Sequence, residues 1–219
     1  RNSLDRIRAE AEQAIRGGCE HVMLTDRAAS KDHVPLPMIL ATGAVHSHLV
    51  KHQLRTFASV NVASGECLDV HHFAVLIGVG ATTINAYAAE WTIIERFEKG
   101  LFKGLKPEQA LVNYRKAIED GLLKIMSKMG ISVIASYRGG YNFEALGLSR
   151  ALVAEFFPPM SSRISGLGLS GVQSRLMGLH KTAYLDNLSY LPVGGLFRYR
   201  KTGERHAFDG QIIHAMQHA

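Results

Sequence analysis

The sequence predicts an α/β protein of parallel β-α repeats, built as a partial, barrel-like domain with about four core strands and a C-terminal linker extension. Short apolar runs of strand length alternate with segments whose apolar residues recur every three or four positions, as on one face of a helix. The connections between the runs are long enough for the crossovers that parallel strands require. Hydrophobic residues make up 47% of the chain and charged residues 20%, which excludes disorder, collagen and coiled coil.

The first half of the chain alternates helix and strand. Residues 4–16 are predicted to be a helix that ends at two glycines, and Asp69 is a typical helix N-cap. The predicted strands cover residues 21–25, 56–62 and 82–86, and the further helices cover residues 38–51, 69–77 and 90–98.

A long helix is predicted to begin at Pro107 and to end at Gly130, because apolar residues follow one helical face between them. Residues 131–135 are predicted to be the fourth core strand. A complete (β/α)8 barrel takes eight strands and about 250 residues, so four strands indicate part of a larger architecture. The chain begins with Arg1, and we expect it to start inside a longer polypeptide or after processing.

The character of the chain changes after residue 157, where two prolines interrupt it. We expect residues 1–157 to form one α/β domain, and residues 158–219 to form a linker and the start of another module. The expected elements of this second part are an extended Ser/Gly-rich connection at 161–170, a helix at 172–179, a strand at 197–200 and a helix from residue 209.

Charge and cysteine content exclude several classes of protein. The net charge is +6, and residues 160–219 hold 7 basic against 3 acidic groups, but no recognition motif accompanies this excess, so no nucleic-acid partner is predicted. Residues 70–89 lack Asp, Glu, Lys and Arg, but their histidines, threonines and glycines do not suit a membrane span. Two cysteines cannot form a disulfide framework and favour a reducing, cytoplasmic location.

Ligands of parallel α/β proteins gather at the carboxyl ends of strands, so the loops there are the candidate site. In one interpretation Arg138 and the backbone amides of residues 136–140 hold an anion. In the other, the glycines only permit a tight turn and Arg138 pairs with a carboxylate. The candidate residues in these loops are Asp26, Arg27, Asn85, Tyr87, Ser136, Arg138 and Gly139.

The histidines and cysteines carry weaker signals. His48 and His52 lie four residues apart and share a helical face, but a metal site needs three or four converging ligands, so structural or surface roles are predicted. Neither Cys19 nor Cys67 has a catalytic partner that the sequence reveals, and small, partly buried thiols are expected.

Several sequence runs resemble the large (α) chain of bacterial, NADPH-dependent glutamate synthase, and the resemblance is collinear over nearly all of the 219 residues. It covers the later part of the central domain and the approach to the FMN-binding synthase region. The runs that carry it include Leu24-Thr-Asp-Arg27, Ala41-Thr-Gly-Ala-Val-His46, Val70-His-His-Phe-Ala74, Ser136-Tyr-Arg-Gly139, Ser162-Arg-Ile-Ser-Gly166 and Leu191-Pro-Val-Gly-Gly195.

The resemblance implies a parent enzyme that forms two glutamates from glutamine and 2-oxoglutarate with NADPH. An amidotransferase domain releases ammonia, which passes through a tunnel to a domain that carries FMN and a 3Fe-4S cluster. A small (β) subunit carries FAD and 4Fe-4S clusters. The amidotransferase and cluster cysteines of the family have no counterpart here, so the resemblance assigns no catalytic, cofactor or metal residue to this segment.

Three hypotheses follow from the sequence. The first is a non-catalytic connecting domain between the amidotransferase and FMN domains, whose strand-end loops face those domains or the tunnel. The second is a free-standing anion- or phosphate-binding enzyme that uses residues 136–140. The third is a purely structural assembly module whose basic tail docks a partner.

Overall fold

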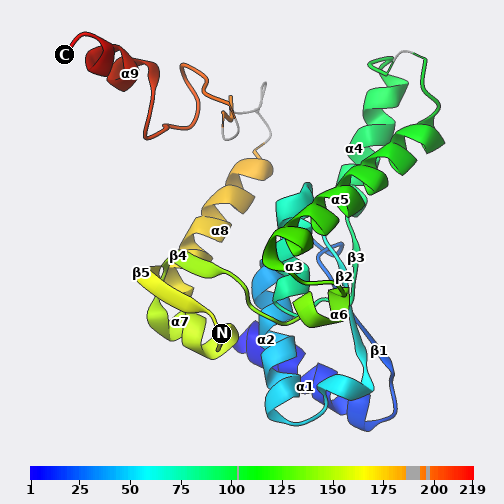
Figure 1. The fold of residues 1–219 in the computed structure, drawn as a ribbon. Coiled ribbons are helices and arrows are strands. Elements are labelled where there is room, and N and C mark those ends of the chain that lie inside the picture. Colours follow the sequence, from blue (N-terminus) through cyan, green and yellow to red (C-terminus); the bar gives the residue numbers. More distant parts are fainter. Residues whose placement is uncertain (103, 186–192, 196–197) are drawn as a thin grey trace. The chain divides into compact units, whose positions relative to one another are not determined.

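The computed structural model describes residues 1–102, 104–185, 193–195 and 198–219 (Figure 1). The chain divides into two compact units, Arg1–His180 and Lys181–Ala219. The predicted domain boundary after residue 157 concerns the longer protein and stays a prediction.

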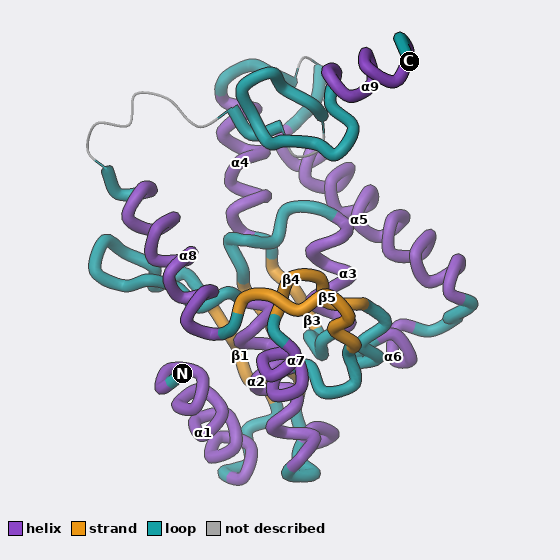
Figure 2. The backbone as a smooth tube through the Cα atoms, turned by 90° about the vertical axis from the view of Figure 1, so that its left-hand side faces the viewer, coloured by secondary structure: helices purple, strands orange, loops and turns teal. Residues whose placement is uncertain are grey.

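A three-stranded parallel sheet lies at the centre of the first unit (Figures 1 and 2). Its strands are β1 (His21–Thr25), β2 (Ser59–Ala63) and β3 (Thr83–Asn85), and they lie side by side in chain order. Parallel pairing requires a crossover after each strand. α2 (Met38–Lys51), followed by the short helix η1 (Arg55–Phe57), makes the first crossover, and α3 (Val70–Gly78) makes the second. The predicted parallel β-α pattern is therefore confirmed.

Helices α1 (Asn2–Arg16) and α2 pack against each other and against the sheet. Ile15, Val45, Leu49 and Val60 form one buried cluster between them, and Leu49 and Val60 are fully buried. The residues of β1 alternate between exposed and partly buried, which shows that only one face of this strand is covered. The chain thus builds one well-packed layer of helices and leaves part of the sheet open.

Helices α4 (Tyr87–Glu98) and α5 (Pro107–Met129) lie side by side beyond the sheet (Figure 1). Pro107 occupies the first turn of α5, and Gly130 ends it with a left-handed φ of 71°, as the sequence predicts. α5 also packs along α3, where Gly121 comes so close to Val70 that a side chain would not fit. α5 is therefore anchored along α3, and its residue Met126 shares a buried cluster with Ile84 of β3.

The predicted fourth core strand at residues 131–135 is wrong. The chain turns there into the short helix α6 (Ile134–Tyr137), and the amide of Ile131 completes the end of α5 by donating to the carbonyl of Met126. A strand needs a neighbouring strand as well as β-branched residues. Since α5 delivers this segment beside α3 and not alongside β3, Val133 has no ladder partner and is 55% exposed.

A second, two-stranded parallel sheet follows, formed by β4 (Glu144–Leu148) and β5 (Ser161–Leu167) with α7 (Arg150–Phe156) between them. The predicted extended segment at 161–170 is a strand over most of its length, and α8 (Leu169–Ala183) is longer than the predicted helix at 172–179. Phe156 of α7 is completely buried in a cluster with residues of α1 and α2, so the second sheet and α7 pack onto these helices within the first unit.

The second unit contains α9 (Gly210–Gln217), which confirms the predicted helix from residue 209, and the Asp209 side chain caps its amino end. The predicted strand at 197–200 begins outside the described residues, and residues 198–200 are not in a strand. The motif at 191–195 also lies partly outside the described residues. In the part of the chain that the structure describes, no helix is both long and apolar enough to cross a membrane.

Candidate functional site

Asp26 organises the carboxyl edge of the central sheet. It follows β1 directly, is 8% exposed, and accepts hydrogen bonds from three neighbours. The backbone amide of Gly65 lies 2.8 Å from its carboxylate, the Tyr87 hydroxyl 2.6 Å, and the Ser64 hydroxyl 3.4 Å. One carboxylate thus ties the loop after β1 to the loop after β2 and to the start of α4.

Arg27 completes this cluster from the solvent side. Its guanidinium donates to Asn85 Oδ1 at 3.0 Å, lies 4.5 Å from the ring centre of Tyr87, and is 5.7 Å from that of Trp91. Such stacking is a cation–π interaction. Burial, reinforced by the hydrogen bond to Asp26, raises the pKa of Tyr87 to about 12, so its hydroxyl stays protonated and donates. The four predicted residues Asp26, Arg27, Asn85 and Tyr87 therefore meet at one edge.

The remaining three predicted residues lie elsewhere, and their prediction as a strand-end loop is wrong. Residues 131–135 form no strand, so Ser136, Arg138 and Gly139 do not follow one. Arg138 lines a shallow pocket together with residues that precede or begin the strands, including His21, Ser59 and Thr82. The 136–139 loop therefore lies at the amino edge of the sheet, while Asp26 lies at the carboxyl edge.

His46 is the buried centre of this amino edge. A side chain at Gly80 would come within 2.2 Å of its ring, and one at Gly139 within 2.8 Å of Nε2, so the ring is enclosed by two glycines with φ of 120° and 67°. Burial, together with the charge of Arg55, lowers the pKa of His46 to about 4. The imidazole is therefore neutral at physiological pH, and Nδ1 accepts a hydrogen bond from Arg55 Nε at 2.9 Å.

Two guanidinium groups share this edge. Arg55 donates to His46, to the carbonyls of Ala58 and Gly80, and to the Thr82 hydroxyl. Burial and the charge of Arg138 lower its pKa. Among the described residues, the buried Nε of Arg138 has no hydrogen-bond partner, and no carboxylate forms an ion pair with either arginine. This edge therefore carries two guanidinium groups that no described carboxylate contacts directly, although Glu20 lines the same pocket.

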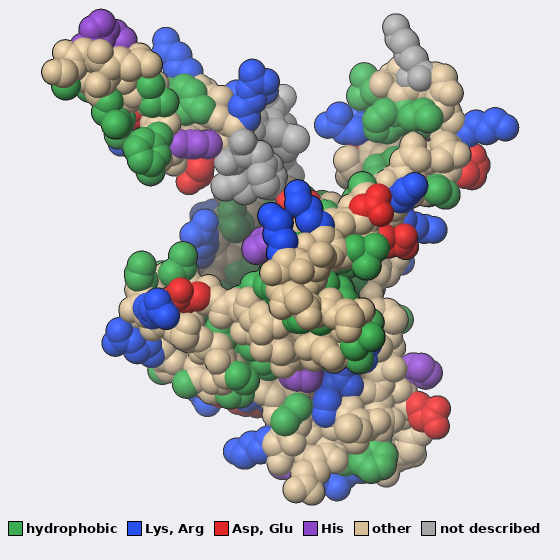
Figure 3. All heavy atoms as spheres, viewed as in Figure 1, with side chains coloured by type: hydrophobic (Ala, Val, Ile, Leu, Met, Phe, Trp, Pro, Cys, Tyr) green, Lys and Arg blue, Asp and Glu red, His purple; other side chains and the backbone are tan. Residues whose placement is uncertain are grey.

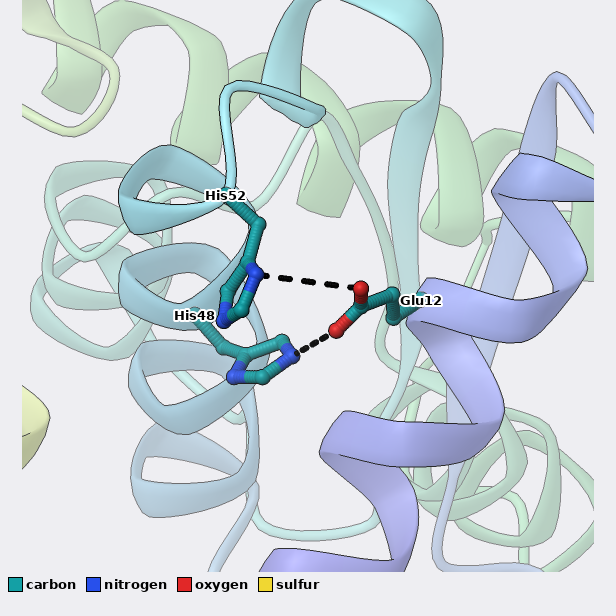
Figure 4. Close-up of side chains that lie close together, drawn as sticks. All are labelled: Glu12, His48 and His52. Atoms are coloured by element: carbon teal, nitrogen blue, oxygen red, sulfur yellow. Dashed lines mark hydrogen bonds and ion pairs between the residues drawn. The ribbon is translucent and has the colours of Figure 1, made fainter.

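A third cluster joins α1 to α2 and is drawn in Figure 4. Glu12 Oε2 lies 2.7 Å from His48 Nε2, and Glu12 Oε1 lies 3.7 Å from His52 Nδ1. The sequence places His48 and His52 on one helical face, but it carries no signal for Glu12, which comes from a different helix 36 positions away. The convergence of three potential ligands is therefore visible only in the structure.

The two cysteines occupy different environments. Cys19 is exposed and Cys67 is buried, so the expectation of two partly buried thiols fails for both. Burial, with a contribution from Asp69, raises the pKa of Cys67 to about 12, which keeps the thiol protonated and unreactive.

Comparison with known proteins places the chain in a family. Residues 1–149 match the model of the glutamate synthase central domain. A glutamate synthase [NADPH] large chain from Azospirillum brasilense is 60% identical over 219 residues, which is all of this chain and 14% of that protein. A glutamate synthase [NADPH] large chain from Bacillus subtilis is 40% identical over 96% of this chain and 14% of that protein.

A ferredoxin-dependent glutamate synthase from Synechocystis is also similar, at 38% identity over 93% of this chain and 14% of that protein. The chain thus spans about one seventh of the length of these relatives. The matches confirm the resemblance that the sequence motifs indicate. The chain therefore belongs to the glutamate synthase family and corresponds to the central part of its large chain.

Proposed function

We propose that this segment is a non-catalytic connector between the amidotransferase and FMN domains of a glutamate synthase large chain. The parent enzyme would form glutamate from glutamine and 2-oxoglutarate with NADPH, in the cytoplasm, and so assimilate ammonia. The connector would hold the two active domains in a fixed relative position, and its loops would help to shape the path of the ammonia. The match to the central-domain model over residues 1–149 supports this proposal.

The observation that carries the proposal is the closed geometry of the carboxyl edge. The Gly65 amide, the Tyr87 hydroxyl and the Asn85 side chain already bond to Asp26 or Arg27, which leaves these groups little capacity for a substrate. Nucleophilic catalysis needs an activated nucleophile and a base within hydrogen-bond reach. The protonated, buried Cys67 does not meet this requirement.

Exposed apolar side chains give the connector surfaces that other domains can cover. Met23 on β1 is 67% exposed and Trp91 on α4 is 61% exposed, and Trp91 contacts the ring of Tyr87 in the Asp26 cluster. Apolar side chains also lie among the charged ones on the face shown in Figure 3. Aromatic residues beside arginines are favoured in protein interfaces. We propose that the edge formed by Asp26, Arg27, Asn85 and Tyr87 packs against a neighbouring domain.

Neither the cysteines nor the carboxyl edge of the sheet fits the cofactors of the proposed parent enzyme. A 3Fe-4S cluster is held by several cysteine thiolates, and the chain has two cysteines, of which Cys67 is buried and protonated. A flavin phosphate needs free backbone amides, and at the carboxyl edge the Gly65 amide is occupied by Asp26. We propose that FMN and the cluster bind elsewhere in the chain, and FAD and 4Fe-4S clusters in a small subunit.

An assay of the purified 219-residue chain tests the connector role. We expect a colourless protein that neither binds FMN in a fluorescence titration nor releases ammonia from glutamine. Flavin that stays bound through gel filtration, or glutamine hydrolysis above that of a heat-denatured sample, contradicts the proposal.

One observation favours a second candidate function, which is binding of an oxoanion at the amino edge. The buried Nε of Arg138 lacks a partner among the described residues, and Arg55 adds a second positive charge. Inorganic phosphate should bind stoichiometrically in calorimetry, and Arg138→Ala should abolish the heat. Arg6→Ala, which removes an exposed arginine from α1, is the matched control. Equal binding by wild type and Arg138→Ala contradicts this function.

A further inference from the structure

The pairing of α1 and α2 brings one carboxylate and two imidazoles to a single point (Figure 4). His48 and His52 lie on successive turns of the same helix end, with ring centres 4.3 Å apart. Glu12 faces both rings from α1, and Figure 4 shows its two oxygen atoms directed at one ring each. One ligand atom from each residue lies within 4.8 Å of the other two.

We propose that Glu12, His48 and His52 form a binding site for a divalent transition-metal ion of the Zn²⁺ type. Two imidazoles and one carboxylate are the protein ligands of many zinc sites, with a water in the fourth position. Tetrahedral bonds of about 2.0–2.1 Å separate neighbouring ligand atoms by about 3.3 Å. The two short separations involve different oxygens of Glu12, with Oε2 2.7 Å from His48 Nε2 and Oε1 3.7 Å from His52 Nδ1. One ligand atom from each residue lies within 4.8 Å of the other two, so side-chain rotations that draw the three atoms together complete the site.

The hydrogen bonds at the site suit a cation. The Glu12 carboxylate offers two oxygens, one to Arg16 Nε and one to His48 Nε2. His48 Nε2 lies at hydrogen-bond distance from this carboxylate. A metal takes the lone pair of Nε2, and the ring proton then sits on Nδ1, a tautomer change that needs no other reactant.

The charged groups around the site also permit binding. Arg16 Nε donates to Glu12 Oε1 at 2.8 Å and competes with the metal for that oxygen. Its side chain is 56% exposed, so it can move into solvent when a cation arrives. The histidines are partly exposed, at 21% for His48 and 38% for His52, which leaves a path for the ion and room for a water ligand. The site is thus accessible without unfolding either helix.

Occupation of the site would join α1 to α2 by bonds that the unfolded chain does not make. A ligand that binds only the folded state raises its stability in proportion to the logarithm of the ligand concentration. The affinity of such N/O sites rises along the series from Mn²⁺ to Cu²⁺, whereas Mg²⁺ prefers six oxygen ligands. Binding should therefore be seen with Zn²⁺, Ni²⁺ and Cu²⁺ and not with Mg²⁺.

The test is a calorimetric titration of the 219-residue chain with ZnCl₂, paired with thermal unfolding in Zn²⁺ and in Mg²⁺. We expect one Zn²⁺ per chain and a melting temperature that rises with Zn²⁺ only. His48→Ala and Glu12→Gln should each weaken binding by at least about tenfold, since loss even of a group that supports a ligand costs 10–100-fold. His71→Ala, which removes an exposed histidine of α3, is the control and should bind like the wild type.

Three results overturn the proposal. They are no saturable Zn²⁺ binding by the wild type, unchanged binding by either His48→Ala or Glu12→Gln, and an equal loss of binding in His71→Ala. Each variant is compared with its own metal-free melting temperature, so a variant that folds but is less stable still gives a clear answer. A variant that does not fold is replaced by His52→Ala, which is expected to show the same tenfold loss.

Discussion

At the scale of single residues, the position of a side chain relative to a predicted element decides whether the sequence can place it in the candidate site. Asp26, Arg27, Asn85 and Tyr87 were predictable because each lies at the carboxyl end of a strand that the sequence predicts or just after it. Glu12 and Arg55 were not, because their partners come from other helices and loops and no local pattern records such convergence. Arg138 was expected in a loop at the carboxyl edge of the sheet, but it lies at the amino edge.

The buried imidazole of His46 predicts a pH dependence of stability. Its pKa is about 4 in the folded protein and about 6.5 when exposed, so the unfolded state takes up the proton first as the pH falls. Stability should be unaffected by this group above about pH 6.5. It should decline between about pH 6.5 and 4, by about 3 kcal/mol in total. Urea unfolding across this range measures the decline.

The variant His46→Gln isolates this contribution, because glutamine can still accept a hydrogen bond from Arg55 Nε. The decline of stability toward pH 4 should be smaller in His46→Gln than in the wild type. His21→Gln, at an exposed position of β1, should keep the wild-type profile. Identical profiles for His46→Gln and wild type would show that His46 does not titrate as described.

Gly139 should tolerate no side chain. Its φ of 67° is in the left-handed region, and a Cβ atom would lie 2.8 Å from His46 Nε2. Strain of this kind costs about 1–3 kcal/mol, so Gly139→Ala should lower the free energy of unfolding by that amount. Chemical denaturation measures it. Gly178→Ala in α8 is the control, because a Cβ there meets no atom within 4 Å; it should leave stability unchanged or raise it. Equal stability of both variants would refute the described enclosure of His46.

At the scale of elements, the spacing of apolar residues predicts a helix or a strand well when contacts within that element are enough to form it. The helices that begin at Pro107 and after Asp69 were predictable from their caps and apolar faces. Residues 131–135 were not, because whether β-branched residues become a strand depends on a neighbour that only the tertiary structure supplies. The pairing of β4 with β5 was missed for the same reason, since each strand forms only against the other and each contains a glycine that weakens its own strand signal.

The cap of α3 should contribute measurably to stability. The Asp69 side chain accepts from the His72 amide at 3.2 Å, and the His72 side chain accepts from the Asp69 amide in return. Loss of such a cap costs about 1 kcal/mol, so Asp69→Ala should lower the free energy of unfolding by about that amount. Asp69→Asn, which can still cap, should recover most of the loss. Asp69→Ala with wild-type stability would contradict the cap.

For the whole molecule, the first compact unit extends to His180 and includes both sheets. His180, the last residue of this unit, is tied to its first half by a hydrogen bond of 2.8 Å between Nε2 and the Ser30 carbonyl. A chain that ends after Ala183, the last residue of α8, should therefore keep the cooperative thermal unfolding and the melting temperature of the 219-residue chain. A melting temperature lower by several degrees would show that the later residues support the first unit.

The direct test of the connector role uses the full-length enzyme and measures ammonia released per glutamate formed. If the edge at Arg27 packs against a neighbouring domain, Arg27→Ala should weaken that contact by removing the hydrogen bond to Asn85 and the stacking on Tyr87. Arg6→Ala serves as the control on α1. We expect the Arg27→Ala enzyme to keep glutamine hydrolysis but to lose ammonia to solvent, while the Arg6→Ala enzyme stays coupled. Full coupling in a correctly folded Arg27→Ala enzyme would contradict the proposed connector role.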